Sequence, residues 1–352
     1  MSTFNGKKIR LEIFGQSHSD TIGVKASGFP SFKFDPVGLN KFLARRKPTG
    51  QNYSTARSEP DVPVFEGVTD GEITGSFTAV IRNTDTRSAD YSELVGKPRP
   101  SHADYAWHLK DGVTDFTGGG RFSGRMTAPL CVVGGIAKDF LEGLGIKIFA
   151  YVKSIGKIDG RSYKDGEIAA DELERLIDSG AFPALSNGEN MLDEIAEAKA
   201  QGDSVGGVIE CIVFGMKKGV GDCLFDGLEG KISSLVYAVP AVKGVEFGDG
   251  FDLAKVRGSV SNDSLRYVDG KVVTAKNSAG GINGGISSGA NITLSVAIRP
   301  TPSIAKEQDT VDLINKVNTK IKIKGRHDAC IVPRAVPCIE SAVALAILDE
   351  IL

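Results

Sequence analysis

The pattern of apolar and polar positions predicts strands along much of the chain. Residues 8–14 and 292–298 alternate between apolar and polar or small side chains, which is typical of half-buried strands. Residues 208–214 form an apolar, β-branched run, and residues 146–155 also predict a strand. Asp70-Gly71 separates two further strand-like runs, and this dipeptide is typical of a hairpin turn.

A helix is expected from Pro36 onwards. Asp35 suits the N-cap and Pro36 suits the first helical position, and apolar residues follow at helical spacing. Arg46 falls on the same apolar stripe, seven residues after Leu39. We therefore expect the Arg46 side chain to point inward at the end of this helix.

Longer helices are expected over residues 126–144 and at the C-terminus. The C-terminal helix is expected to begin near Val336-Pro337, and its apolar residues cover most of its circumference. Such a helix is normally buried between other layers. Strands and helices mix without regular alternation, and no repeat or linker divides the chain. The sequence therefore predicts an α+β fold in one interwoven domain, residues 1–352, with a peripheral helical excursion around 165–203.

Composition narrows the classes of function. The 42 Lys and Arg residues balance 44 Asp and Glu residues, so the net charge of −2 gives no general field for nucleic acid or an anionic membrane. No apolar stretch reaches the roughly 18 residues of a membrane span, and the first 15 residues lack the apolar core of a signal peptide. Five cysteines without paired spacing are expected to be reduced, in a cytoplasmic protein without a metal site.

The common nucleotide and hydrolase motifs do not occur. The chain has no GxGxxG after a strand, no GxxxxGK[ST], no GxSxG and no HExxH. A Rossmann dehydrogenase, a P-loop enzyme and a serine or zinc hydrolase are therefore disfavoured. A phosphohydrolase using His and Arg stays open, although neither a placed nucleophile nor a DxD-type metal site is found.

Candidate chemistry lies in glycine loops that carry histidine and arginine. These loops are residues 15–18, 99–105, 118–125, 280–289 and 325–328. Arginine binds phosphate and carboxylate bidentately, glycine-rich backbone N–H groups bind anions, and histidine exchanges protons near neutrality. The pattern predicts a pocket for a multiply anionic small molecule without naming it. Read singly, Gly118–Gly120 could be a simple turn, and His108 is read as a structural residue.

Nine ordered motifs, from about residue 6 to the C-terminus, make the chain resemble chorismate synthase. They include Gly15-Gln16-Ser17-His18, Arg99 to Tyr105, Gly118 to Arg121, Pro240 to Gly248 and Gly325 to Asp328. The resemblance implies conversion of 5-enolpyruvylshikimate 3-phosphate to chorismate and phosphate by anti-1,4-elimination. It also implies reduced FMN as cofactor, a compact fold with helices sandwiched between antiparallel sheets, and a homotetramer. NADPH is a possible reductant of the flavin.

The resemblance also assigns roles residue by residue. His18 resembles the histidine that protonates the leaving phosphate, His102 the one that protonates the reduced flavin, and Asp328 the aspartate near flavin N5, where the substrate proton is taken. The residues expected to bind substrate are Ser17, Arg46, Ser123, Arg125 and Arg326. Those expected to bind FMN are Arg46, Arg121, Phe122, Ser123, Ala241, Gly284, Arg299, Pro300, Thr301, Pro302, Ser303 and Arg326.

Several positions depart from the family pattern. Gln16 replaces a glutamate, and Ser101 stands where glycine is usual. Phe122 replaces a serine and Met126 a glutamate, in the segment expected to bind both ligands. The proton-transfer residues and arginines remain, which favours activity. The alternative is a flavin- or anion-binding paralogue that has lost catalysis or changed its substrate.

Overall fold

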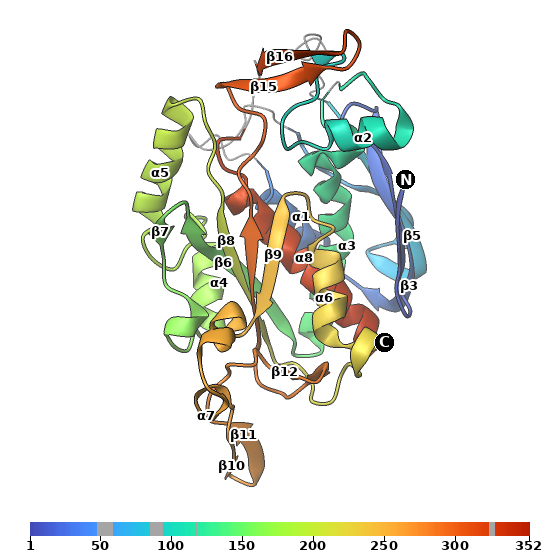
Figure 1. Ribbon diagram of the computed structural model, residues 1–352. Coiled ribbons are helices and arrows are strands. Elements are labelled where there is room, and N and C mark those ends of the chain that lie inside the picture. The colour runs from blue at the N-terminus through green and yellow to red at the C-terminus, as the bar shows by residue number, and fades with distance from the viewer. Residues whose placement is uncertain (48–58, 85–93, 117, 324–327) are drawn as a thin grey trace.

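Two five-stranded antiparallel sheets enclose a layer of helices (Figure 1). The computed structural model describes residues 1–47, 59–84, 94–116, 118–323 and 328–352. The first sheet has the order β1-β2-β3-β5-β4. Its strands are β1 (Ser2–Asn5), β2 (Arg10–Gly15), β3 (Thr21–Lys33), β4 (Val64–Thr69) and β5 (Glu72–Arg82). The turn between β4 and β5 is Asp70-Gly71, so the predicted hairpin is confirmed.

The second sheet has the order β7-β6-β8-β14-β9. Its strands are β6 (Lys147–Ile155), β7 (Ile158–Asp159), β8 (Gly207–Phe214), β9 (Val242–Phe247) and β14 (Ile292–Ile298). The predicted strands are confirmed, but β14 is buried on both faces instead of one. Its polar face is covered because the Tyr163 hydroxyl reaches the Ser295 hydroxyl at 2.9 Å. Alternation along a strand therefore did not imply an exposed face here.

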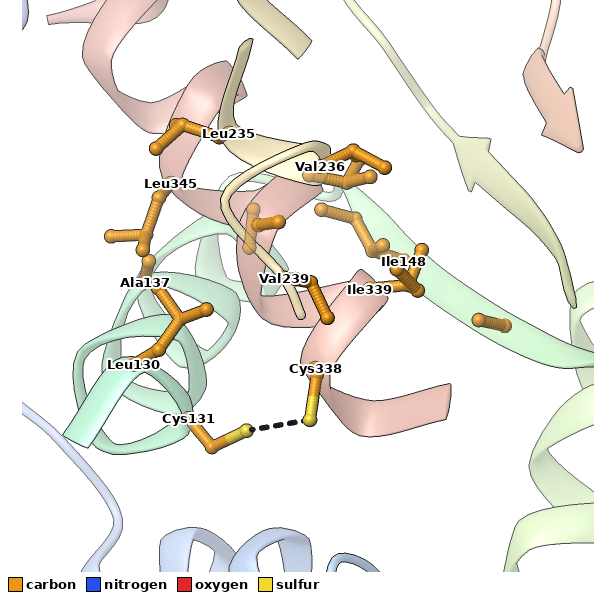
Figure 2. Packing of buried hydrophobic residues seen from close by; sticks show 14 of the residues in the cluster. Leu130, Cys131, Ala137, Ile148, Leu235, Val236, Val239, Cys338, Ile339 and Leu345 are labelled. Carbon is orange, nitrogen blue, oxygen red and sulfur yellow. Dashed lines mark hydrogen bonds between the residues drawn. The ribbon is translucent and has the colours of Figure 1, made fainter. Parts of the chain in front are cut away.

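The helices between the sheets are α1 (Pro36–Ala44), α3 (Thr127–Gly143), α6 (Leu228–Val236) and α8 (Val332–Ile351). Helix α3 packs on β3 and β5 of the first sheet, whereas α8 packs on β6 and β8 of the second. The two helices pack on each other through apolar side chains such as Leu130 and Leu345, with the Cys131 and Cys338 sulfurs 3.7 Å apart (Figure 2). The predicted sandwich of helices between antiparallel sheets is confirmed.

The start of the C-terminal helix was predicted wrongly. Helix α8 begins at Val332, so Pro337 lies inside it. Pro333 occupies the first turn, where a missing N–H costs nothing. Pro337 removes one hydrogen bond from a helix that is buried over almost its full length, and packing compensates for this local loss. The predicted burial of the helix between layers is confirmed.

Helix α1 follows its sequence signals closely. The Asp35 carboxylate accepts a hydrogen bond from the Val37 N–H at 2.8 Å, as an N-cap should. Two short helices, α4 (Ala170–Asp178) and α5 (Gly188–Ala200), occupy the expected excursion and pack against β6. Helix α2 (Asp104–Asp111) was not expected, because its segment is mostly polar.

The remaining elements are short; β15 and β16 lie at one end of the molecule, and β10, β11 and α7 at the other (Figure 1). Three two-stranded sheets are β10 (Leu265–Val268) with β11 (Lys271–Thr274), β12 (Ile282–Asn283) with β13 (Ile286–Ser287), and β15 (Glu307–Asp312) with β16 (Val317–Lys322). The short helices are η2 (Gly120–Phe122), η3 (Gly124–Met126), η4 (Tyr163–Asp165), η5 (Leu224–Asp226), η6 (Gly250–Lys255) and α7 (Gly258–Ser261). None of the helices in the described ranges is long and apolar enough to cross a membrane.

Candidate functional site

A cavity of ≈ 300 Å³ lies where the start of α8 meets η2, η3 and several loops. It gathers residues that are far apart in the sequence. Its lining includes Arg46, Glu59, Asp61, Arg99, His102, Phe122, Ser123, Arg125, Ala241, Arg299, Thr301, Pro302, Ser303, Asp328 and Arg334. A larger, open hollow on the first sheet, lined by residues such as Arg10 and Glu66, contains none of the predicted site residues.

Two buried arginines share one carboxylate in this cavity. Arg46 lies just beyond the end of α1 and is 4% exposed, which confirms that it points inward. Its Nη2 donates to Asp61 Oδ2 at 2.5 Å, and Arg125 Nη1 donates to Asp61 Oδ1. Burial acts to raise the pKa of Asp61, but the two guanidinium groups outweigh it and lower this pKa. Asp61 is therefore ionised between two cations.

His102 is held by a buried aspartate. The His102 Nδ1 atom is 2.5 Å from Asp104 Oδ1, and Arg99 makes two hydrogen bonds to the same carboxylate, from Nε at 2.7 Å and from Nη2 at 2.8 Å. Since an ionised carboxylate only accepts, Nδ1 carries its proton and Nε2 on the opposite edge of the ring can exchange one. Burial acts to raise the pKa of Asp104, but these bonds lower it to about 2. Burial lowers the pKa of His102.

The backbone conformation of Ser101, the residue before His102, explains how serine can stand where the family pattern has glycine. Ser101 has a φ of 57°, in the left-handed region where glycine is favoured. The loop therefore keeps the backbone shape that a glycine would adopt, at the cost of some strain in Ser101. This shape carries the chain from Arg99 into helix α2.

His18 lies against the triple-glycine segment. A Cβ on Gly118 would be 2.2 Å from the His18 ring, so the loop needs glycine at this position. The Ser17 N–H donates to the Gly120 carbonyl at 3.2 Å, and the Ser17 hydroxyl is 3.0 Å from His18 Nδ1. The Gly118 carbonyl accepts a hydrogen bond from Arg99 Nη2 at 2.6 Å. The backbone of Gly118 thus connects the His18 loop to the His102 cluster.

Asp328 is positioned from the first turn of α8. Arg334 Nη1 donates to Asp328 Oδ2 at 2.6 Å, and Arg334 Nε donates to the Arg46 carbonyl at 3.0 Å. The Thr301 hydroxyl donates to the Asp328 carbonyl at 2.8 Å. One arginine therefore connects the predicted proton acceptor with the predicted anion clamp.

Phe122 forms part of the cavity wall and packs on its neighbours. Its ring makes a T-shaped contact with Trp107, with centroids 5.5 Å apart, and the Arg121 guanidinium lies 5.1 Å from its centroid. Arg121 also donates to Asp111 at 2.6 Å. The Phe122 ring is 38% exposed, so packing on Trp107 leaves part of it open to solvent or a ligand.

Some predicted residues do not line the cavity. Arg121 and Pro300 are adjacent in sequence to residues that do, and Arg326 falls outside the described residues. Ser17 and His18 contact Gly120 and Gly118, which flank the lining residue Gly119. Gly284 belongs to the β12–β13 hairpin, away from the cavity lining. In that loop the glycines permit close backbone approaches; a Cβ on Gly285 would be 2.1 Å from the Asp222 carbonyl oxygen.

The sequence interpretation assigned no role to Asp61, Asp104 or Arg334. Asp104 lies in the motif of residues 99–105, so its closeness in sequence to His102 could have indicated that it binds this histidine. Asp61 follows a stretch with no periodic pattern, and Arg334 sits among the apolar residues of α8. Their partners are set by the fold, and no local pattern marks them.

The cavity suits a ligand with an anionic group and an apolar, flat part. In the part of the chain that the structure describes, Arg46 Nε, Arg125 Nη2 and Arg299 Nε are buried and have no hydrogen-bond partner. Buried donors of this kind are normally satisfied, so they fit an anion. Val239, Pro240 and Ile331 supply an apolar wall. Within the described residues, no three His, Cys, Asp or Glu side chains are grouped so that they could hold a metal ion.

Comparisons with known proteins agree over the whole chain. The family model for chorismate synthase matches residues 9–352. The chorismate synthase of Korarchaeum cryptofilum is 42% identical over 99% of this chain and 96% of its own length, and that of Thermococcus kodakarensis is 41% identical over 99% and 97%. A crystal structure of chorismate synthase aligns with a TM-score of 0.74 at 25% identity, covering 99% of this chain and 92% of its own. The chain belongs to the chorismate synthase family.

Proposed function

We propose that this cavity is where the chain converts 5-enolpyruvylshikimate 3-phosphate to chorismate and phosphate, the reaction of its family. The observation that carries the proposal is the set of buried arginine donors that lack partners among the described residues, in the cavity that His102 and Asp328 also line. The substrate has one phosphate and two carboxylates, and guanidinium groups bind both kinds of anion bidentately. An anionic ligand would satisfy the donors of Arg46, Arg125 and Arg299.

The elimination requires the substrate to lose a proton and its phosphate group. His18, next to Ser17, donates a proton to the oxygen of the leaving phosphate, and the Asp328 carboxylate, held by Arg334, takes the proton from substrate carbon. His102 exchanges a proton through Nε2 because Asp104 holds Nδ1. Ser17 and Ser123 supply further hydrogen bonds to substrate. General acid–base groups of this kind each contribute about 10²–10⁴-fold to turnover.

The residues present fit reduced FMN. The apolar wall with Phe122 suits the flat ring system, while Arg299, Thr301 and Ser303 supply polar groups on the same cavity. Arg299 Nε has no hydrogen-bond partner within the described ranges, which supports binding of an anionic tail. When bound, reduced FMN supplies electron density that assists cleavage of the carbon–oxygen bond and is not consumed overall. NADPH is proposed as one possible reductant.

We also propose, from the family resemblance, that the enzyme is a cytoplasmic homotetramer. Gly284 and the rest of the residues 280–289 loop lie away from the cavity of their own chain, so their expected contact with FMN stays a prediction. A size measurement in solution, by light scattering, tests the tetramer. A monomer at working enzyme concentration would contradict it.

A second candidate is a paralogue that binds flavin without turnover or acts on another substrate. Phe122 favours it, because a ring stands where a hydroxyl is usual and lines the cavity. The test is an anaerobic assay with 5-enolpyruvylshikimate 3-phosphate and FMN reduced by dithionite, repeated with NADPH alone. Chorismate formation supports the synthase, flavin binding without chorismate supports the paralogue, and phosphate release without flavin indicates a phosphohydrolase.

A further inference from the structure

Asp61 occupies the position that an anionic ligand would take between Arg46 and Arg125. It is 3% exposed, and each of its carboxylate oxygens accepts a hydrogen bond from one of the two guanidinium groups. All three side chains line the cavity. The residues expected to form the anion clamp are therefore paired with a carboxylate of the protein.

Asp61 does not bind every guanidinium nitrogen of Arg46 and Arg125. Arg46 Nε and Arg125 Nη2 are buried and find no hydrogen-bond partner among the described residues, although both arginines contact Asp61 through other atoms. Glu59 is the second carboxylate nearby, with Oε2 at 3.9 Å from Arg125 Nη2. The same Glu59 oxygen accepts hydrogen bonds from the Thr84 N–H at 2.8 Å and the Thr84 hydroxyl at 2.9 Å. Arg46 Nη1 also donates to the Thr127 hydroxyl at 3.3 Å, and Arg125 Nε donates to Asn83 Oδ1 at 2.9 Å. The donors that a ligand would use are therefore Arg46 Nε and Arg125 Nη2.

Charge explains why such a carboxylate is needed. Two buried guanidinium groups side by side repel each other, and each costs free energy to remove from water. Asp61 compensates one of the two positive charges. An incoming anion must approach this negative charge, so the arginines that attract the anion and the carboxylate that repels it act at the same place.

We propose that Asp61 is a resident counter-ion of the substrate site, which keeps Arg46 and Arg125 in place and limits how tightly the site holds phosphate. This inference rests on the proposed function. A monoanionic carboxylate ligand would only repeat the contact that Asp61 already makes. A phosphate dianion brings a second charge and a third oxygen, so it alone gains enough to use the remaining donors.

The same arrangement favours release of the product. When phosphate leaves, Asp61 still compensates one of the two guanidinium charges, which lowers the cost of an empty site. Removing the Asp61 charge should therefore tighten binding of free phosphate, whereas loss of a merely structural contact would weaken it. The sign of the change separates the two roles.

The experiment titrates inorganic phosphate, and acetate as a monoanion, into the folded full chain at constant ionic strength by calorimetry. Asp61→Asn is expected to bind phosphate tighter by on the order of tenfold, with a smaller change for acetate. Asp252→Asn removes the same charge from an exposed ion pair outside the cavity and should change phosphate affinity less than about twofold. Unchanged or weaker phosphate binding in folded Asp61→Asn overturns the inference.

A second variant covers the case in which Asp61→Asn does not fold. Glu59→Gln removes the more distant charge, and phosphate should then bind tighter by roughly threefold; unchanged affinity there counts against the inference. Phosphate titration needs no turnover, so it is independent of the anaerobic assay. A chain that makes chorismate while Asp61→Asn binds phosphate no tighter keeps the proposed function and loses this inference.

Discussion

Arg45 and Arg46 are neighbours in the sequence, yet they enter two different buried ion clusters. Arg45 makes two hydrogen bonds of 2.8 Å to the carboxylate of Glu340, in the middle of α8. Lys138 donates to the same carboxylate at 2.7 Å, and the Ala150 N–H donates at 2.9 Å. Arg46 instead meets Asp61 at the cavity, and its Nε has no hydrogen-bond partner among the residues that the structure describes.

The Glu340 and Asp61 clusters differ in whether their buried polar groups all have hydrogen-bond partners. In the Glu340 cluster each cation, amide and carboxylate oxygen named above has a partner, and the cluster joins α1, α3, α8 and β6. Complete networks of this kind fix the packing of layers. In the Asp61 cluster two cations share one carboxylate. Arg46 Nε and Arg125 Nη2 have no hydrogen-bond partner among the described residues. Buried groups without partners mark a ligand site better than burial or charge alone.

The largest expected effect concerns the two predicted catalytic histidines, His102 in the cavity lining and His18 beside the triple-glycine segment. His18→Ala and His102→Ala should each lower turnover by about 10²-fold or more without unfolding the chain, because each removes a general acid–base group. Steady-state kinetics measure turnover, and circular dichroism measures folding. His108→Ala is the control, since His108 lies in α2 outside the cavity lining and its Nδ1 is 2.9 Å from the Val113 carbonyl oxygen. Near-normal turnover in both His18→Ala and His102→Ala would remove the catalytic assignment.

A matched pair of substitutions tests the comparison directly. Arg45→Met should destabilise the fold by about 3 kcal/mol, because it leaves Glu340 buried with one cation fewer, while KM changes little. Arg46→Met should raise the substrate KM by roughly tenfold or more, because part of the anion clamp is lost. Urea denaturation and kinetics are measured on both variants. If the two arginines gave the same pattern, the division into a packing cluster and a ligand cluster would be wrong.

The pH dependence of stability tests the role of the Glu340 cluster in packing. Burial acts to raise the pKa of Glu340, but Arg45 and Lys138 lower it to about 2 from an ordinary value of 4.5. Its contribution to stability is therefore complete above pH 4.5 and is lost as the pH falls towards 2. Glu340→Gln should cost roughly 3 kcal/mol at pH 7 and almost nothing at pH 2. Denaturation curves of Glu340→Gln and of the Asp252→Asn control, recorded between pH 2 and pH 7, test this prediction. An equal loss of unfolding free energy in Glu340→Gln at both pH values would contradict it.

The smallest effect is expected at Phe122. Its ring packs on Trp107 and Arg121 and is partly open, so wild-type protein should bind FMN in the presence of substrate. Phe122→Ser removes this packing and adds a hydroxyl, and the FMN dissociation constant should change by less than about tenfold, since each contact is worth on the order of 1 kcal/mol. Flavin fluorescence titration measures it. Binding only in the serine variant would show that the ring blocks the cavity.

Much of the fold and part of the site were predictable from the sequence. The strands of the second sheet, the Asp70-Gly71 hairpin and the Asp35 cap follow from alternation and turn chemistry, which act over a few residues. The inward side chain of Arg46 followed from its place on an apolar stripe. The motifs, read together, indicated the family and placed His102, Arg125 and Asp328 in one site.

The tertiary structure alone decided which carboxylates Arg45 and Arg46 meet. The Arg45 side chain meets a carboxylate 295 residues away, while Arg46 meets one only 15 residues away. The start of α8 was also decided by packing, since a buried helix tolerates Pro337 where local propensity would end it. Local patterns set the elements because their interactions are local. The partners of Arg45 and Arg46 depend on how the layers pack. Each ion pair is surrounded by side chains from several elements, and no single stretch of sequence contains them all.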